Sequence, residues 1–162
     1  IINTKRFRLK TLTEDDASEK YLAWFSNSKE VIDYISFAKI NADIDKLRQY
    51  LKEREDKPDI LFLGIFTNTG QHIGNIKYEP INFKEHSATL GILIGEKEWR
   101  GKGVATEVIE YSIRFLKDKY KIKYIDLGVN EENVAALMTY KKMGFKVSKK
   151  INSDLLMRLN LG

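Results

Sequence analysis

The sequence predicts an α+β domain, and three observations point to it. Its 162 residues, 43% of them hydrophobic, suit one compact core, so we expect residues 1–162 to form a single domain. Runs of strand-like hydrophobicity are interspersed with segments whose apolar residues recur at helical spacing. The longest helical segment follows a glycine-rich turn at 100–105, which comes soon after a strand-like run.

The N-terminal part predicts a strand and two helices. Phe7 and Leu9 alternate with basic residues, which is the pattern of a half-buried strand. Thr13, with an acidic residue three positions later, resembles a helix N-cap and opens a helical region that runs to Phe25. A second helix is predicted over 43–56, where one face is apolar and the other charged.

The middle of the chain is rich in strand signals. Residues 60–66 form a continuous β-rich run, and the Asn-Thr-Gly sequence at 68–70 is a hairpin turn signal. A strand resumes at 72–78, and another is predicted over 87–95.

The C-terminal part alternates helices and strands. After the glycine turn, helical spacing of apolar residues continues to about Tyr120. A strand at 124–129 and a short helix at 133–143, ended by a glycine, come next. Two further strands are predicted at 145–149 and 154–159.

The composition narrows the function classes. The absence of cysteine excludes disulfides and thiolate catalysis, and the two histidines, His72 and His86, have no carboxylate pair at ligand spacing, so we expect no metal. Both histidines fall near strand beginnings, where we expect them to be solvated. No apolar stretch approaches the ~20 residues of a membrane span, and we expect a reduced, cytoplasmic setting. No signal-peptide pattern opens the sequence. Because the first residue is Ile1 and not methionine, removal of a leader before Ile1 stays an open alternative.

The net charge of +5 arises from 28 basic and 23 acidic residues that are interspersed along the chain. A surplus of this size suits a phosphate-rich ligand or simple solubility. It does not indicate nucleic acid binding, since no aromatic RNA-type motif accompanies it.

The turn at 100–105 reads Arg-Gly-Lys-Gly-Val-Ala. A strand that passes through glycines into a helix leaves backbone N–H groups unpaired at the positive end of the helix dipole, here with two cationic side chains beside them. Such a turn binds phosphate or pyrophosphate. The structural alternative is a tight connection before a helix, a role that glycine often fills.

Spacing separates the candidate ligands of this turn. A nucleoside triphosphate site would need a glycine, four residues and then Gly-Lys-Ser/Thr, but five residues separate Gly95 from the Gly-Lys pair, and Gly103 follows that pair. A dinucleotide site would need a third glycine where Thr106 stands. The remaining candidate is the pyrophosphate of coenzyme A.

A second motif lies downstream. Asn133 and Tyr140 are seven residues apart, two helical turns, so both project from one face of the same helix. Taken alone, Asn133 could be a helix N-cap and Tyr140 a partly buried aromatic residue.

Together the two motifs resemble the GNAT superfamily of acetyl-coenzyme A dependent N-acetyltransferases. The residues that carry this resemblance are Arg100, Gly103, Ala105, Asn133, Ala136, Tyr140, Gly144 and Phe145. Segments 74–76, 101–107 and 142–145 most resemble the branch of ribosomal-protein alanine N-acetyltransferases, which includes amino-sugar acetyltransferases. The resemblance implies a three-layer fold, with a central mixed, mostly antiparallel sheet of six to seven strands and about four flanking helices.

The resemblance also implies an acetyl-CoA site. Backbone amides of the turn would hold the pyrophosphate, the preceding strand would run beside the pantetheine arm, and Asn133 would bind the arm from the other side. Tyr140 would donate a proton to the departing thiolate. The implied cofactor-binding residues are Ile92, Leu93, Ile94, Arg100, Gly101, Lys102, Gly103, Val104, Ala105, Thr106, Asn133, Ala136 and Tyr140.

The reaction also needs a general base. Relatives often carry a glutamate on the strand before the glycine turn, but Thr89 and Leu90 occupy that place here. We take Glu79, at the end of the preceding strand, as the candidate base, acting directly or through water. A surface salt bridge is the structural alternative for Glu79.

The acceptor side is expected to involve the first helices and the loop between them. The candidate acceptor-binding residues are Trp24, Tyr34, Asn75 and Glu79, with Phe25 and Phe37 as further wall candidates. The aromatic residues among them could equally be core residues.

The implied reaction is direct attack of a primary amine on acetyl-CoA in a ternary complex, without a covalent enzyme intermediate. The acceptor is a nucleotide-linked amino sugar or another small amine, and a protein N-terminus is the main competitor. A catalytically inactive acyl-CoA-binding module is the alternative from another class. We expect a monomer or homodimer with no nucleic acid or membrane partner.

Overall fold

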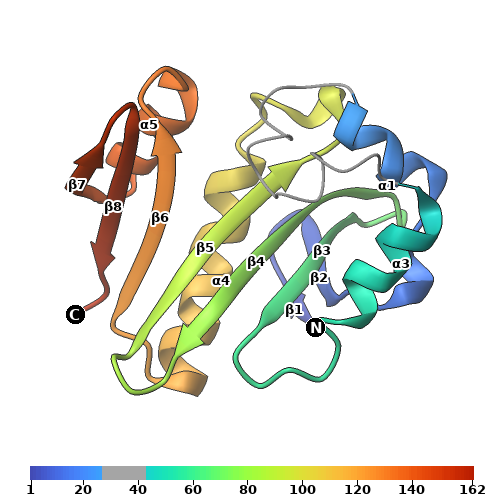
Figure 1. Ribbon diagram of the computed structural model, residues 1–162, viewed down its shortest axis with the longest axis horizontal. Helices are drawn as coiled ribbons and strands as arrows, with labels where there is room; N and C mark the ends of the chain where they lie inside the picture. The colour runs from blue at the N-terminus through green and yellow to red at the C-terminus, as the bar shows by residue number, and fades with distance from the viewer. Residues whose placement is uncertain (27–42) are drawn as a thin grey trace.

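The computed structural model describes residues 1–26 and 43–162, which form one eight-stranded sheet with helices on both faces (Figure 1). The strand order is β1-β2-β3-β4-β5-β6-β8-β7. All neighbouring strands pair antiparallel except β5 and β6, which pair parallel. The mixed, mostly antiparallel sheet is therefore confirmed.

The strands are β1 (Ile2–Asn3), β2 (Phe7–Thr11), β3 (Leu61–Thr67), β4 (His72–Asn82), β5 (Ser87–Ile94), β6 (Tyr124–Asn130), β7 (Lys146–Ile151) and β8 (Asp154–Asn160). Among the described residues the α-helices are α1 (Glu19–Ala23), α3 (Ile44–Lys52), α4 (Val104–Tyr120) and α5 (Val134–Lys142). The sheet exceeds the expected six to seven strands by β1. This strand spans only two residues, too few to show a period-2 pattern in the sequence.

The predicted helix from Thr13 to Phe25 is wrong in its form. Thr13 and Asp16 do make a reciprocal capping box, but it starts a single 3-10 turn, Glu14–Asp16, after which Ala17 is extended. Ser18 then caps the five-residue α1 by accepting from the Tyr21 N–H. Each N-cap residue, Thr13 and Ser18, has extended backbone. Two N-caps five residues apart therefore interrupt the helical region, and one continuous helix does not form.

Two other elements differ from prediction in their ends. Helix α3 stops at Lys52, four residues before the predicted end at 56. Strand β4 continues past Tyr78 to Asn82 through the cis Glu79–Pro80 peptide bond, with a register shift against β5 between Tyr78 and Ile81. A proline inside a strand has no N–H for the ladder, which fits a break in register at this point.

Two buried clusters lie on opposite faces of the sheet. The larger cluster joins the sheet to α4, with Val108, Ile109 and Leu116 fully buried, and α5 packs against it through partly buried residues. The smaller cluster joins the other face to α1 and α3. The result is a three-layer arrangement, as expected. No helix among the described residues is both long and apolar enough to cross a membrane.

Strands β5 and β6 diverge along their length. Their parallel ladder covers only 87–89 opposite 124–126, although β5 continues to Ile94 and β6 to Asn130. Figure 1 shows β5 leaning toward β4 and away from β6, with α5 at the wide end of the wedge. The sheet is thus opened at the end of β5 that leads into the glycine turn.

A close approach of β4 and β5 makes Gly74 sensitive to substitution. A Cβ at this position would lie 2.3 Å from the Leu93 carbonyl oxygen, a backbone atom that cannot rotate away. We expect Gly74→Ala to destabilise the fold by roughly 2–3 kcal/mol, in the range of overpacked cores. Urea unfolding measures this change.

Gly128 supplies the matched control on β6. A Cβ there would meet only Leu156, at an ordinary contact distance of 3.8 Å, so Gly128→Ala should leave stability within about 1 kcal/mol of the parent. Equal midpoints for the two variants would refute the close-approach argument.

Candidate active site

A cavity of about 380 Å³ opens at the wide end of the β5–β6 wedge. It is lined by the end of β5, the glycine turn, the first turn of α4 and one side of α5. The lining residues are Ile92, Leu93, Ile94, Trp99, Arg100, Gly101, Gly103, Val104, Ala105, Thr106, Asn133, Ala135, Ala136, Thr139 and Tyr140. The structure therefore brings together every residue of the predicted cofactor set except Lys102, which is exposed and outside the lining.

Sequence reasoning missed three lining residues, Trp99, Ala135 and Thr139. Ala135 and Thr139 lie on the same helix as the predicted Ala136 and Tyr140, so helical spacing could have found them. Trp99 precedes the glycine turn in a 3-10 turn, Lys97–Trp99, and its ring packs edge-on against Phe7 of β2 at 5.4 Å between centroids. That contact is not visible in a sequence.

The glycine turn has the backbone conformation that its sequence suggested. Gly101 and Gly103 have φ of +73° and +76°, in the left-handed region that glycine adopts without strain. Gly103 is the N-cap of α4 and offers no side-chain oxygen to the first-turn N–H groups. The N–H groups of the first turn therefore have no side-chain cap, and they lie at the positive end of the helix dipole, which lines the cavity. An uncapped helix N-terminus of this kind favours an anion.

The Arg100 side chain is anchored to the end of β5. Its Nε donates to the Ile94 carbonyl oxygen at 3.0 Å, so the guanidinium ties the turn back to the end of β5. A fixed cation thus lies beside the α4 N-terminus.

Helix α5 supplies the opposite wall. Asn133 is its N-cap, and the Asn133 Oδ1 accepts from the Ala136 N–H at 3.3 Å. Two turns further on, the half-buried ring of Tyr140 packs against Phe145 at 5.8 Å between centroids. Burial raises the pKa of the Tyr140 hydroxyl, so this phenol remains protonated at neutral pH.

Glu79 lies apart from this cavity. Its Oε1 accepts from Arg54 Nε at 2.8 Å, and the two side chains are 26% and 20% exposed. The guanidinium of Arg54 also lies over the Tyr50 ring, 3.6 Å from its centroid. The salt bridge expected as the alternative for Glu79 is therefore present, and its partner Arg54 lies in the turn just after α3.

The acceptor candidates are divided among several places. Trp24 is buried, and its Nε1 donates to Glu96 Oε1 at 3.0 Å. Asn75 is fully buried on β4, directly opposite the cavity residue Leu93 in register. Tyr34 and the further candidate Phe37 lie outside the described residues.

The expectation that both histidines are solvated is wrong for His72. Its ring is half-buried, stacks on Phe66 at 4.7 Å and contacts Asn75 Oδ1 at 2.7 Å through Nε2. Burial is the main cause that lowers the pKa of this imidazole, which favours its neutral form. The expectation failed because α1 folds over the start of β4 and brings Tyr21 onto the ring. His86 is exposed in a turn, as expected.

No group of three or more potential ligands placed to hold a metal ion occurs in the described parts of the chain. Among residues 1–26 and 43–162, those that line the cavity contribute apolar side chains, backbone and a few neutral polar groups, and Arg100 is the one charged residue of that lining. This donor set suits an anionic ligand with an apolar arm better than a cation.

Comparison with known proteins agrees with this geometry. The sequence model of the family described as "Acetyltransferase (GNAT) domain" matches residues 6–146. An N-alpha-acetyltransferase of Saccharolobus solfataricus is 36% identical over 76 residues, which cover 46% of this chain and 44% of that protein. Spermidine N(1)-acetyltransferase of Escherichia coli K12 is 25% identical over 140 residues, which cover 86% of this chain and 73% of that protein.

Solved structures share the fold. The microcin C7 self-immunity acetyltransferase MccE, crystallised with acetyl-CoA and AMP, superposes with a TM-score of 0.81 at 18% identity, covering 97% of this chain and 93% of that one. The family match spans most of the sequence and includes both the glycine turn and the Asn133–Tyr140 helix. The chain therefore belongs to the acetyltransferase (GNAT) domain family.

Proposed function

We propose that this domain transfers an acetyl group from acetyl-CoA to a primary amine. One observation carries the proposal: a single cavity has an uncapped helix N-terminus with Arg100 at one wall and the protonated phenol of Tyr140 at the other. The first wall fits a pyrophosphate, and the second fits a thioester sulfur.

Different residues of the cavity bind different parts of acetyl-CoA. Backbone N–H groups from Gly103 to Thr106 hold the pyrophosphate, and Arg100 adds a positive charge beside it. The end of β5, from Ile92 to Ile94, pairs with the pantetheine arm through main-chain groups, because β6 has already diverged at this level. Asn133 donates to the arm from the side of α5.

The chemistry follows from acetyl-CoA, which supplies a thioester whose carbonyl carbon bonds to the amine nitrogen as the C–S bond breaks. A neutral amine loses one proton as the amide forms, and the sulfur gains one, so the transfer is balanced in protons. Tyr140 donates the proton to the sulfur, and a base receives the proton of the amine. The cavity walls orient the two reactants, which supplies much of the acceleration.

For the base we propose Glu79, acting through water, since it lies on β4 beyond the cavity lining. We expect Glu79→Gln to lower kcat/KM, because a neutral amide cannot receive the proton of the amine. The remaining rate should rise with pH only as the amine itself loses its proton, and should be lower by roughly tenfold or more near neutral pH. Initial rates measured across the pH range test this.

Glu53→Gln is the control, because Glu53 is an exposed carboxyl that also approaches Arg54, at 4.0 Å. An unchanged pH profile in Glu79→Gln would remove Glu79 from the mechanism and leave solvent as the base.

For the acceptor we propose a small primary amine, such as a nucleotide-linked amino sugar. The relationship to a polyamine acetyltransferase over most of the chain supports a small amine. A protein N-terminus is the second candidate, and the N-alpha-acetyltransferase relative, matched over 44% of its length, supports it.

The test is a thiol-release screen with acetyl-CoA across amino sugars, polyamines and N-terminal peptides. Turnover with any small amine at least tenfold above peptides supports the first candidate, and the reverse supports the second. Acetyl-CoA binding without turnover on any amine class would indicate an inactive acyl-CoA-binding module. Light scattering during size-exclusion chromatography tests the proposed monomer or homodimer.

A further inference from the structure

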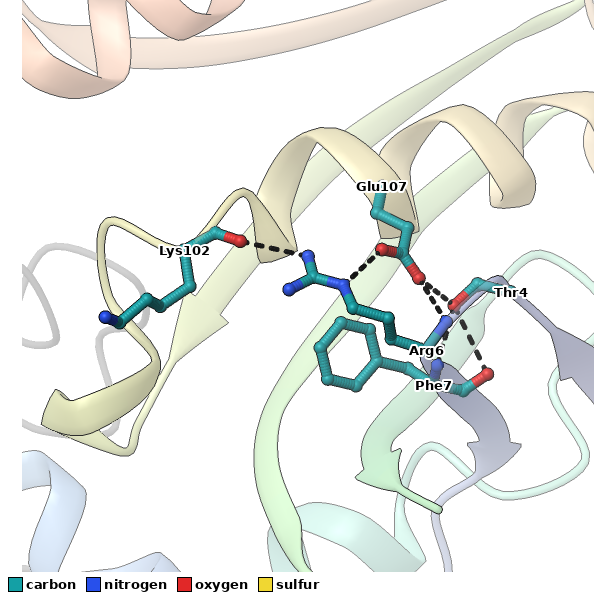
Figure 2. A network of polar contacts seen from close by, with 5 residues as sticks. All are labelled: Thr4, Arg6, Phe7, Lys102 and Glu107. Carbon is teal, nitrogen blue, oxygen red and sulfur yellow. Dashed lines mark hydrogen bonds and ion pairs between the residues drawn. The ribbon is translucent and has the colours of Figure 1, made fainter.

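A polar network joins the N-terminal segment to the glycine turn and the first helical turn of α4 (Figure 2). Arg6 Nε donates to Glu107 Oε1 at 2.7 Å, and the Arg6 backbone N–H donates to Glu107 Oε2 at 2.7 Å. Thr4 Oγ1 donates to the same Oε2 at 2.6 Å. A second nitrogen of the guanidinium, Nη2, donates to the Lys102 carbonyl oxygen at 2.9 Å.

The network fixes the direction of one peptide plane. The bond between Lys102 and Gly103 is trans, so its C=O and N–H point to opposite sides. Arg6 holds the carbonyl oxygen, and Figure 2 shows the guanidinium between that oxygen and the Glu107 carboxylate. The Gly103 N–H therefore points away from Arg6, and Gly103 lines the cavity whereas Lys102 does not.

The network also neutralises the negative charge of Glu107 near the N-terminus of α4. Glu107 in the first turn of α4 suits the helix dipole, but an unpaired carboxylate there would repel an anion in the cavity. Burial opposes ionisation of Glu107, yet the hydrogen bonds from Thr4 and Arg6 outweigh it and hold the pKa of this carboxyl below its usual range. Glu107 is 12% exposed and Arg6 40% exposed, so the charge pair is partly shielded from solvent.

A second contact from the same segment reaches the residue just before the turn. Phe7, next to Arg6, is buried and packs edge-on against Trp99, which lines the cavity just before the turn. Residues 6 and 7 thus contact residues before, within and after the turn, although they lie about a hundred residues away in the sequence.

We infer that Arg6 is a positioning residue, which holds the Lys102–Gly103 peptide in the orientation that binds the pyrophosphate of coenzyme A. This inference rests on the proposed function. Arg6 acts through the backbone of the turn: its guanidinium links the Lys102 carbonyl to the Glu107 carboxylate and offsets the charge of that carboxylate. A flat, five-donor group suits this double role better than an ammonium does.

The test compares two ligands in Arg6→Gln. Isothermal titration with CoA should give a Kd about fivefold higher than that of the parent protein, the loss expected for one hydrogen bond that orders the site. Pantetheine ends before the pyrophosphate, so its affinity, measured by ligand-detected NMR, should be unchanged. Arg6→Lys keeps the charge but lacks the forked donors and should show the same selective loss.

Arg8→Gln is the matched control, because it removes the same charge from the exposed face of β2, two residues further along. Its CoA affinity should equal that of the parent. Equal CoA affinity in Arg6→Gln and the parent, or equal weakening of CoA and pantetheine, would overturn the positioning role. Absence of CoA binding by the parent protein would instead overturn the proposed function, and this inference with it.

Discussion

Replacing Tyr140 with phenylalanine should lower kcat by on the order of a hundred- to ten-thousand-fold, the range for loss of a positioned proton donor. Burial raises the pKa of this hydroxyl, so the group is present as a donor at neutral pH. The ring remains in Tyr140→Phe, so its packing against Phe145 should persist. The Kd for acetyl-CoA should therefore change by no more than about fivefold, since a single neutral hydrogen bond is worth about 1 kcal/mol or less.

Steady-state rates and calorimetry on the same preparation separate these two effects. Tyr120→Phe is the control, because Tyr120 lies at the opposite end of α4 from the cavity and its ring packs on Phe83 and Phe115. Wild-type kcat in Tyr140→Phe would remove the proposed acid. Equal losses in kcat and in cofactor affinity would assign Tyr140 to binding instead.

Replacing Gly103 with alanine should weaken acetyl-CoA binding by about five- to thirtyfold, because a left-handed non-glycine residue costs roughly 1–2 kcal/mol and the turn can relax by leaving that conformation. Space is not the cause of this effect. A Cβ at Gly103 would come no nearer than 3.7 Å to a neighbouring group, the end of the Arg6 side chain. The penalty therefore comes from the φ of +76°.

Gly70→Ala separates the backbone cost from the binding loss. Gly70 has a φ of +86° in the β3–β4 hairpin, has open space for a Cβ, and does not line the cavity. Both variants should lose similar stability in urea unfolding, but only Gly103→Ala should lose affinity in calorimetry. Parental affinity in Gly103→Ala would show that the turn does not need its left-handed conformation to bind.

The cavity could be foreseen from the sequence because its residues come from two local motifs. The glycine turn specifies its own backbone conformation, and the seven-residue spacing of Asn133 and Tyr140 puts both on one helix side. One further step, the divergence of β5 from β6, brings these two motifs to the same cavity. That step depends on a parallel strand pair. The resemblance to the superfamily implied a mixed sheet, but local sequence patterns do not show which strands pair parallel.

The contacts that were missed are those between distant segments. Arg6 and Glu107 are 101 residues apart, and nothing in either local sequence marks them as partners. His72 looked solvated because its own strand begins there, but Tyr21, from a segment about fifty residues earlier, covers it. The acceptor candidates Trp24, Asn75 and Glu79 lie outside the cavity lining. Trp24 and Glu79 are bound to Glu96 and Arg54, partners from distant segments that local sequence does not reveal.

The central claim is that the cavity at the glycine turn binds acetyl-CoA. Isothermal titration of the parent protein with acetyl-CoA tests it most directly, because it needs no knowledge of the acceptor amine. One site per chain is expected, with heat that is lost when the protein is first saturated with CoA. No detectable binding at millimolar acetyl-CoA would contradict the account.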